Sequence, residues 1–231
     1  MIDAVIFDKD GTLFDFRQSW GGVASSILAE LARDPDHAAA LAAAVGYDPA
    51  TRGFAADSLM IAGTSAEIAA VMLPLLPDMT LDGLVARLSS LSVTAPMYPA
   101  VPLRQVLSDL RDRGLRIGLA TNDTEGPARV HLAEAGVEEL FDFIAGCDSG
   151  YGAKPEPGML LAFVRAFGLQ AGRVVMVGDS RHDLVAGKAA GMRAVGVLTG
   201  IADRDELHPH ADAVLPDIAG LAAWIDALPR D

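Results

Sequence analysis

Short apolar runs alternate with amphipathic segments along most of the chain. Runs rich in β-branched and aromatic residues are typical of buried strands, and apolar positions three or four apart indicate helices. The predicted strands are 2–7, 115–120, 143–146, 174–177, 194–198 and 213–215. The predicted helices are 103–113, 125–135, 157–167, 183–190, a short one near 203, and 218–228. This alternation predicts an α/β fold, in which right-handed βαβ units build a doubly wound parallel sheet.

Residues 17 to about 92 have a different pattern, rich in Ala and Leu. Their apolar positions recur at helical spacing over 22–31, 38–45, 66–76 and 81–91, and the region contains no convincing strand. Thr64 and Glu67 have the spacing of a capping box ahead of the third of these helices. A proline-rich linker follows at 94–102. We therefore expect an all-helical domain, 16–96, inserted into an α/β core formed by 1–15 and 97–231.

The composition indicates a well-packed protein with an acidic surface. The chain has 231 residues, of which 51% are hydrophobic, so it is long and apolar enough for a large core, with or without an inserted domain. Its formal net charge of −13 argues against nucleic acid or an anionic membrane as a partner. A small phosphorylated substrate is not excluded, because a binding site can be locally positive, above all where it holds a metal ion.

Cysteine usage and the N-terminus bear on location. Cys147 is the only cysteine, so no intrachain disulfide forms, which favours a reducing, cytoplasmic setting. The N-terminus enters the first predicted strand directly, without the basic segment of a signal peptide, and no apolar run reaches membrane-spanning length. The sequence leaves the oligomeric state open.

The first predicted strand ends in a pair of carboxylates. Asp8 and Asp10 follow it two residues apart, so both side chains point the same way from its carboxyl end. Ligands of open parallel α/β sheets bind at that edge. Gly11 then permits a backbone conformation that other residues resist. Two adjacent carboxylates need compensation by a cation or a shared proton, which makes this turn a candidate site.

Three further polar signals follow predicted strands or the loops after them, and a parallel sheet gathers them at the same edge. They are Thr121 with Asn122, Lys154, and Asp179 with Asp183. Each also has an ordinary structural explanation: a helix cap, a surface lysine and a partner for a helix dipole. The alternative is a phosphate-binding helix N-terminus together with an oxygen-rich Mg²⁺ site that includes Asp8.

Taken together and in this order, these motifs resemble the haloacid dehalogenase superfamily of aspartate-nucleophile phosphatases. The matching segments are Asp8-Lys9-Asp10-Gly11-Thr12, Thr121-Asn122, Lys154-Pro155 and Gly178-Asp179-Ser180-x-x-Asp183. The helical insertion resembles the C1-type cap of that family. The first motif, with Asp15 at its end, is most similar to the phosphoglycolate phosphatase group, which implies a small phosphorylated metabolite as substrate.

The resemblance implies a role for each residue. Asp8 is the expected nucleophile that forms an aspartyl-phosphate, and Asp10 the general acid and base. Mg²⁺ is the expected cofactor, bound by the Asp8 carboxylate, the Asp10 backbone carbonyl and Asp179, with Asp183 acting through water or orienting the site. Thr121, Asn122 and Lys154 are the expected phosphate-binding residues.

The cap is expected to contact the leaving group. Arg17 and Trp20 lie just beyond the first motif, and Arg52 belongs to 46–53, the least helical part of the cap, where it is a candidate partner for a substrate carboxylate. The competing interpretation is that both arginines are surface charges and that Trp20 belongs to the cap core. His182, beside the fourth motif, is close enough in sequence to touch the site, although a solvent-facing imidazole is the expectation.

Other reaction classes stay open or are disfavoured. A sugar-phosphate mutase of the β-phosphoglucomutase type has the same motifs and returns the phosphoryl group to sugar. A non-catalytic binding protein of this fold is disfavoured because Asp8 and Asp10 are both present. Asp10 also argues against a dehalogenase, because a departing halide needs no proton. The absence of lysine from the cap argues against a phosphonoacetaldehyde hydrolase, which forms a Schiff base there.

Overall fold

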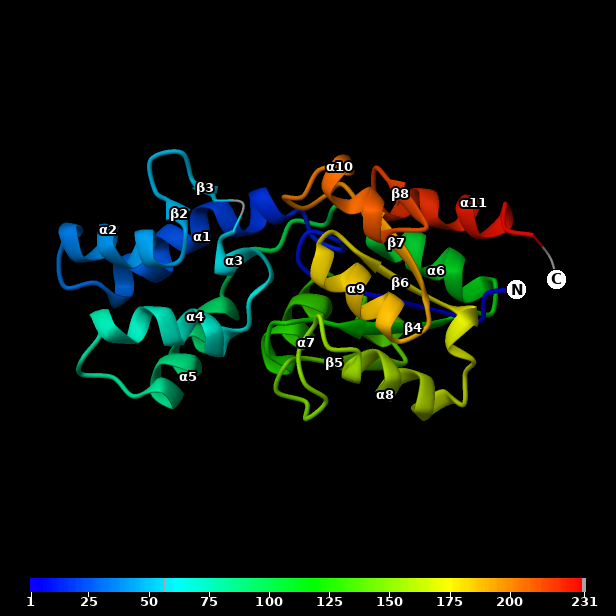
Figure 1. The fold of residues 1–231 in the computed structure, drawn as a ribbon, viewed down its shortest axis with the longest axis horizontal. Helices are drawn as coiled ribbons and strands as arrows, with labels where there is room; N and C mark the ends of the chain where they lie inside the picture. The colour runs from blue at the N-terminus through cyan, green and yellow to red at the C-terminus, as the bar shows by residue number, and fades with distance from the viewer. Residues whose placement is uncertain (56, 230–231) are drawn as a thin grey trace.

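A computed structural model describes residues 1–55 and 57–229. In Figure 1 an α/β core and a helical body lie side by side along the long axis of the molecule. The core contains a six-stranded sheet in the order β5-β4-β1-β6-β7-β8, and every strand pair is parallel. The strands are β1 (Ala4–Phe7), β4 (Arg116–Ala120), β5 (Phe143–Ala145), β6 (Val174–Gly178), β7 (Arg193–Val197) and β8 (Ala213–Leu215). The predicted α/β fold is confirmed.

Strand β1 lies at the centre of the sheet and is buried on both faces. Ala4 pairs with Arg116 of β4 on one side and with Val174 of β6 on the other. Val5 and Phe7 enter one hydrophobic cluster, whereas Ala4 and Ile6 enter the cluster on the opposite face. Burial on both faces explains why the strand is a continuous apolar run rather than an alternating one.

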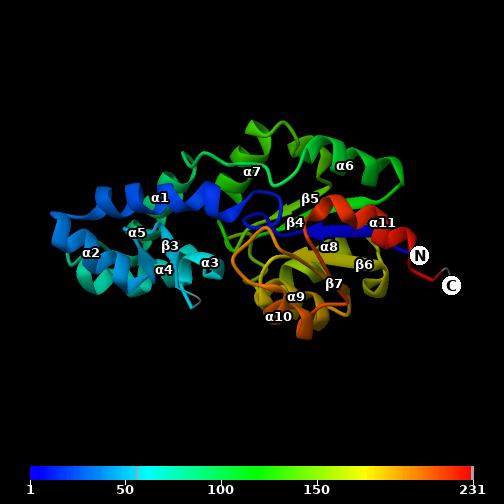
Figure 2. The same cartoon turned by 90° about the horizontal axis from the view of Figure 1, so that it is seen from above.

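Helices cover both faces of the sheet. One face packs against α6 (Leu103–Asp112), α7 (Glu125–Glu134) and α11 (Leu221–Asp226). The other packs against α8 (Gly158–Phe167) and α9 (Arg181–Ala189), with α10 (Arg204–Leu207) beyond them. Figure 2 shows α6 and α7 on one side of the strands and α9 and α10 on the other. Within the described residues, no helix is both long and apolar enough to cross a membrane.

The helical body has a hydrophobic cluster of its own, built by residues such as Leu41, Met72 and Leu84. Its helices are α1 (Phe16–Leu31), α2 (Pro35–Ala44), α3 (Leu59–Ala62), α4 (Ser65–Met72) and α5 (Leu81–Ser92). Thr64 and Glu67 form the predicted capping box at the start of α4. We refer to 16–96 as the cap.

The prediction that the cap contains no strand is wrong. A short antiparallel pair joins β2 (Tyr47–Asp48) to β3 (Gly53–Phe54). The Asp48 side chain accepts hydrogen bonds from the turn, from the backbone N–H of Ala50 and the hydroxyl of Thr51. Two-residue strands are too short to produce the alternating pattern that would reveal them.

Helix α1 begins at Phe16, six positions before the predicted start at 22. Asp15 is its N-cap, and the Asp15 carboxylate accepts a hydrogen bond of 2.8 Å from the backbone N–H of Gln18. The first turns carry polar residues and a Gly21-Gly22 pair, which weaken the helical pattern although the backbone is helical there.

Two chain segments that lie side by side connect the cap to the core. The backbone N–H of Asp15 donates to the carbonyl of Tyr98 at 2.9 Å, and that of Ala100 donates to Leu13 at 2.9 Å. Because Leu13 follows β1 closely, this double linker places the cap against the carboxyl ends of the strands (Figure 1).

Candidate active site

The cap and the core enclose one cavity at the carboxyl ends of β1, β4 and β6. All of the predicted core site residues line it, although they lie far apart in the sequence. They are Asp8, Asp10, Thr121, Asn122, Lys154, Asp179 and Asp183. The parallel sheet explains this convergence, since each residue lies directly after the carboxyl end of a strand, in the loop that follows it or in the first turn of the next helix.

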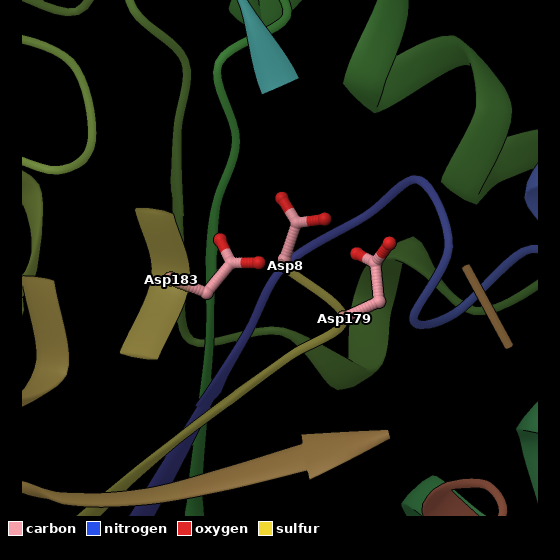
Figure 3. A group of neighbouring side chains, drawn as sticks. All are labelled: Asp8, Asp179 and Asp183. Carbon is pink, nitrogen blue, oxygen red and sulfur yellow. The ribbon is translucent and has the colours of Figure 1, made fainter. Parts of the chain in front are cut away.

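Three buried carboxylates form the centre of the site. Oxygen atoms of Asp8, Asp179 and Asp183 all lie within 4.8 Å of one another. Figure 3 shows the three side chains next to one another with their carboxyl groups pointing to the same side. Asp8 follows β1, Asp179 follows β6 and Asp183 belongs to α9. The ammonium group of Lys154 lies 2.6 Å from Asp8 Oδ1 and 2.6 Å from Asp183 Oδ1.

The charges of this cluster fit a divalent cation. Burial, opposed by Lys154 and reinforced by Asp183 and Asp10, raises the pKa of Asp8 to about 7. Burial and the charges of Asp183 and Asp8 raise the pKa of Asp179 well above its usual value. When ionised, three carboxylates beside one ammonium leave an excess of two negative charges, which a divalent ion would neutralise. Carboxylate oxygens are the ligands that hard cations such as Mg²⁺ prefer.

Two glycines make room for the Asp179 carboxylate. A Cβ atom at Gly11, whose φ is +81°, or at Gly200 would overlap the Asp179 carboxyl group. The sequence predicted that Gly11 permits a backbone conformation that other residues resist, and its positive φ agrees with this. Gly200 was missed, although it closes the turn after β7 at the same edge of the sheet.

Replacing Gly200 by Ala is expected to displace Asp179 and to weaken divalent-metal binding about 10–100-fold, as loss of a group that orients a ligand does. Calorimetric metal titration of the purified variant measures this, with a thermal melt to verify folding. Gly172→Ala is the matched control, because a Cβ there meets nothing within 4 Å. An unchanged metal affinity in Gly200→Ala would contradict this assignment.

Asn122 fixes the backbone of Lys154. The backbone N–H of Lys154 donates to Asn122 Oδ1 at 2.8 Å, and Asn122 Nδ2 donates to the Lys154 carbonyl at 2.9 Å. Asn122 Nδ2 also donates to the carbonyl of Ala62, in the cap, at 2.8 Å. The side chain predicted to bind phosphate is thus used to orient the lysine and to join the cap to the core.

Thr121 and Asp183 are both held by local hydrogen bonds. Thr121 Oγ1 accepts a hydrogen bond of 3.1 Å from the backbone N–H of Asp123, so its own hydroxyl hydrogen remains available to a ligand. Asp183 Oδ2 accepts from the backbone N–H of Ser180 at 3.0 Å and from its hydroxyl at 2.7 Å. Asp183 therefore completes a capping box at the start of helix α9, and its other oxygen accepts from Lys154. Its expected role beside Mg²⁺ stays a prediction.

The Asp10 carboxylate stands apart from the carboxylate cluster. Its Oδ1 accepts a hydrogen bond of 2.8 Å from Trp20 Nε1 of the cap, and its Oδ2 lies 3.3 Å from the ammonium of Lys9. Trp20 is therefore in contact with the site. The predicted contact of Asp10 with the metal is through its backbone carbonyl, and it stays a prediction.

Lys9 is a second residue whose part in the site sequence reasoning missed. It is fully buried, and its ammonium donates to Asp123 Oδ2 at 2.6 Å and contacts His131 Nδ1 at 3.0 Å. Burial opposes the charge, but Asp10 and Asp123 outweigh it and raise the pKa of Lys9 to about 12. Burial and Lys9 lower the pKa of His131, so the neutral ring accepts from Lys9 and donates through Nε2 to the Ser92 carbonyl at 3.0 Å.

The predicted substrate residues of the cap lie elsewhere. Arg17 and Arg52 are exposed and line a second cavity beside α1 and β3, not the one that contains the carboxylates. Their predicted contact with substrate stays a prediction that this arrangement does not favour. His182 is exposed, as expected, and lies at the edge of the site cavity.

Known proteins resemble this chain over nearly its whole length. A phosphoglycolate phosphatase of Rhodospirillum rubrum is 33% identical, and the match covers 97% of this chain and 91% of that protein. A phosphoglycolate phosphatase of Neisseria meningitidis is 30% identical, with 94% and 88% covered.

Solved structures share the fold. An HAD phosphatase from Thermococcus onnurineus matches with a TM-score of 0.69 at 23% identity, over 97% of this chain and 98% of that one. A β-phosphoglucomutase from Clostridium difficile matches with a TM-score of 0.68 at 18% identity, over 98% and 96%. The family model of haloacid dehalogenase-like hydrolases matches residues 2–191. With its sequence motifs gathered in one cavity, the chain belongs to the haloacid dehalogenase-like hydrolase family.

Proposed function

We propose that this protein is a Mg²⁺-dependent phosphatase that hydrolyses small phosphate monoesters through an aspartyl-phosphate on Asp8. The observation that carries the proposal is the single cavity in which Asp8, Asp10 and Lys154 meet two further carboxylates. The names of the relatives support phosphate esters as the substrate class and make phosphoglycolate the first substrate to test.

In the first step an Asp8 oxygen attacks phosphorus and the bond from phosphorus to the ester oxygen breaks. Asp10, in its protonated form, gives its proton to the departing alcohol. Lys154 neutralises charge on Asp8, and the Thr121 hydroxyl donates to a phosphoryl oxygen. In the second step Asp10 takes a proton from water, which attacks the aspartyl-phosphate, releases phosphate and restores the Asp8 carboxylate.

Asp8, Asp179 and the Asp10 backbone carbonyl are the residues that would bind Mg²⁺, with Asp183 beside them. The bound ion supplies positive charge that offsets the repulsion between the carboxylates and the phosphate dianion. Oxygen donors favour Mg²⁺ over softer metals that prefer nitrogen or sulfur.

The test is phosphate release from a panel of esters with Mg²⁺, and with the chelator EDTA in its place. The panel holds phosphoglycolate, glycerol phosphate, short alkyl phosphates and a hexose 1-phosphate. We expect release with Mg²⁺ and at least about a hundredfold loss on chelation, which removes the charge that stabilises the transition state. No Mg²⁺-dependent release from any ester would contradict the proposal, and conversion of hexose 1-phosphate to hexose 6-phosphate would indicate a mutase.

A further inference from the structure

The two sides of the site cavity differ in polarity. The core side presents the carboxylates, Lys154 and Thr121. The cap side, where the leaving group of a bound ester must lie, is built largely from hydrocarbon. Its lining residues include Phe16, Ile27, Met60, Ile61, Ile68 and Leu88. Specificity in such pockets comes from apolar surface and from a few polar groups placed to orient the ligand.

Few positive charges are available to a leaving group. Among the described residues that line the cavity, only Lys154 and His182 are basic, and both belong to the core. Lys154 is bound to Asp8 and Asp183, and exposed His182 lies at the edge. Lys9 is fully buried and bound to Asp10 and Asp123.

A carboxylate on the leaving group would therefore enter an unfavourable environment. The carboxylate would lose its hydration shell beside the apolar cap residues named above, which we call the apolar wall, and no cation of the cap would replace it. The carboxylates of Asp10 and Asp123, which also line the cavity, would repel it. Desolvating a charge without a partner costs much free energy. An alkyl group at the same place would gain from burial.

The size of the cavity limits the leaving group further. Its volume is about 100 Å³. This is several times the roughly 10–15 Å³ that a single water needs, so the cavity suits a small ligand rather than an extended one. A phosphoryl group takes part of this space, which leaves room for an ester oxygen and a short carbon chain.

We propose that the cap side of the cavity selects a short apolar alkyl leaving group, so that the preferred esters are short-chain, uncharged alkyl phosphates rather than carboxylated phosphates of the same size. This inference rests on the proposed phosphatase function. The apolar wall supplies the preference, and Asp10 lies where it can protonate the alkoxide that departs.

Isobutyl phosphate and phosphoglycolate provide a matched pair, because they have equal numbers of non-hydrogen atoms. With the Mg²⁺-loaded protein, kcat/KM is expected to be at least about tenfold higher for isobutyl phosphate than for phosphoglycolate. Burial of two methylene groups is enough to give a factor of this size. Glycerol phosphate has a polar but uncharged leaving group, and its kcat/KM is expected to lie between those of the other two esters. Isobutylphosphonate and phosphonoacetate, which resist hydrolysis, should show the same order in calorimetric binding.

A charge introduced into the wall tests its role directly. Met60→Lys is expected to lower or reverse the ratio between the two esters, because it gives a leaving-group carboxylate a partner. Val71→Lys is the control, since Val71 is an exposed cap residue that does not line the cavity. It should leave the ratio unchanged.

Opposite results would overturn the inference. A wild-type preference for phosphoglycolate, lost on His182→Gln, would show that the edge of the cavity binds the carboxylate. Tighter binding of phosphonoacetate than of isobutylphosphonate would contradict the inference even without turnover. Failure of the phosphatase function itself is distinct, because it means no metal-dependent phosphate release from either ester.

Discussion

Replacing Asp8 by Asn is expected to abolish phosphate release, with a fall in kcat of about 10⁴-fold or more, as for loss of a nucleophile in other covalent enzymes. Asn has the same shape and still accepts a hydrogen bond from Lys154, so the cavity should be preserved. Its amide oxygen is too weak a nucleophile to displace an alkoxide from phosphorus. Phosphate release measured under saturating Mg²⁺ with the best ester of the panel tests this.

The same substitution is expected to stabilise the metal-free protein at alkaline pH. Asp8 has a folded-state pKa of about 7 against an ordinary value of 3.8, so its ionised form destabilises the folded state. This destabilisation is absent below the ordinary pKa, grows as the pH rises and is complete above pH 7. At one pKa unit per 1.36 kcal/mol its upper limit is roughly 4 kcal/mol. Asp8→Asn should therefore raise the melting temperature in EDTA at pH 8 but not at pH 4.

Asp78→Asn is the control for both measurements, because Asp78 is exposed in the cap and lies outside the site. It should retain wild-type turnover and the wild-type dependence of melting temperature on pH. If Asp8→Asn kept activity within tenfold of the wild type, the nucleophile would have to be another residue. If it melted lower than the wild type at pH 8 without metal, the burial of an ionised Asp8 carboxylate would not be the dominant effect on stability.

The sheet and the core site residues were predictable from the sequence for one physical reason. Buried parallel strands are continuous apolar runs, and they end at the edge where ligands bind, so Asp8, Thr121 and Asp179 are marked by position alone. Their order along the chain then matched a known family. The prediction therefore rested on local sequence patterns, and the parallel sheet brings the residues that carry them together at one edge.

Features that depend on tertiary contacts were not predictable in this way. The β2–β3 pair is too short to leave a pattern, and the polar first turns of α1 hide a helix that Asp15 caps. Arg52 was selected for its loop and its charge, but the cap directs it to another cavity. A lysine between two aspartates has the appearance of an exposed turn residue. Lys9 is buried by tertiary contacts that the sequence does not reveal, with Asp123, with His131 of α7 and with the ring of Trp20 in the cap.

Lys9→Met is expected to destabilise the protein and to change its dependence on the leaving group. The variant keeps the length of the side chain but leaves the carboxylates of Asp10 and Asp123 without their shared cation. Removal of one partner from a buried ion pair typically costs about 3–5 kcal/mol. Denaturant unfolding measures this loss, and Lys9→Met combined with Asp123→Asn should recover part of it by restoring the charge balance.

The effect on catalysis follows from the position of Asp10. Lys9 and Trp20 hold the two oxygens of Asp10, and without Lys9 the carboxyl group loses one of these supports. A misplaced general acid matters most for alkoxide leaving groups, which need a proton, and little for p-nitrophenolate, which departs without one. We expect kcat for alkyl phosphates to fall about a hundredfold and kcat for p-nitrophenyl phosphate to fall less than about tenfold.

Lys188→Met is the control for Lys9→Met, because it also replaces a lysine by methionine but does so far from Asp10. Lys188 is a surface residue of α9 paired with Asp212, so its replacement should change neither stability by more than about 1 kcal/mol nor the ratio of the two rates. Equal losses for both leaving groups in Lys9→Met would mean that Lys9 supports only the fold. The informative outcome is a fall in kcat for alkyl phosphates only. If the double variant shows the same fall although its stability has recovered, Lys9 positions Asp10 for proton transfer.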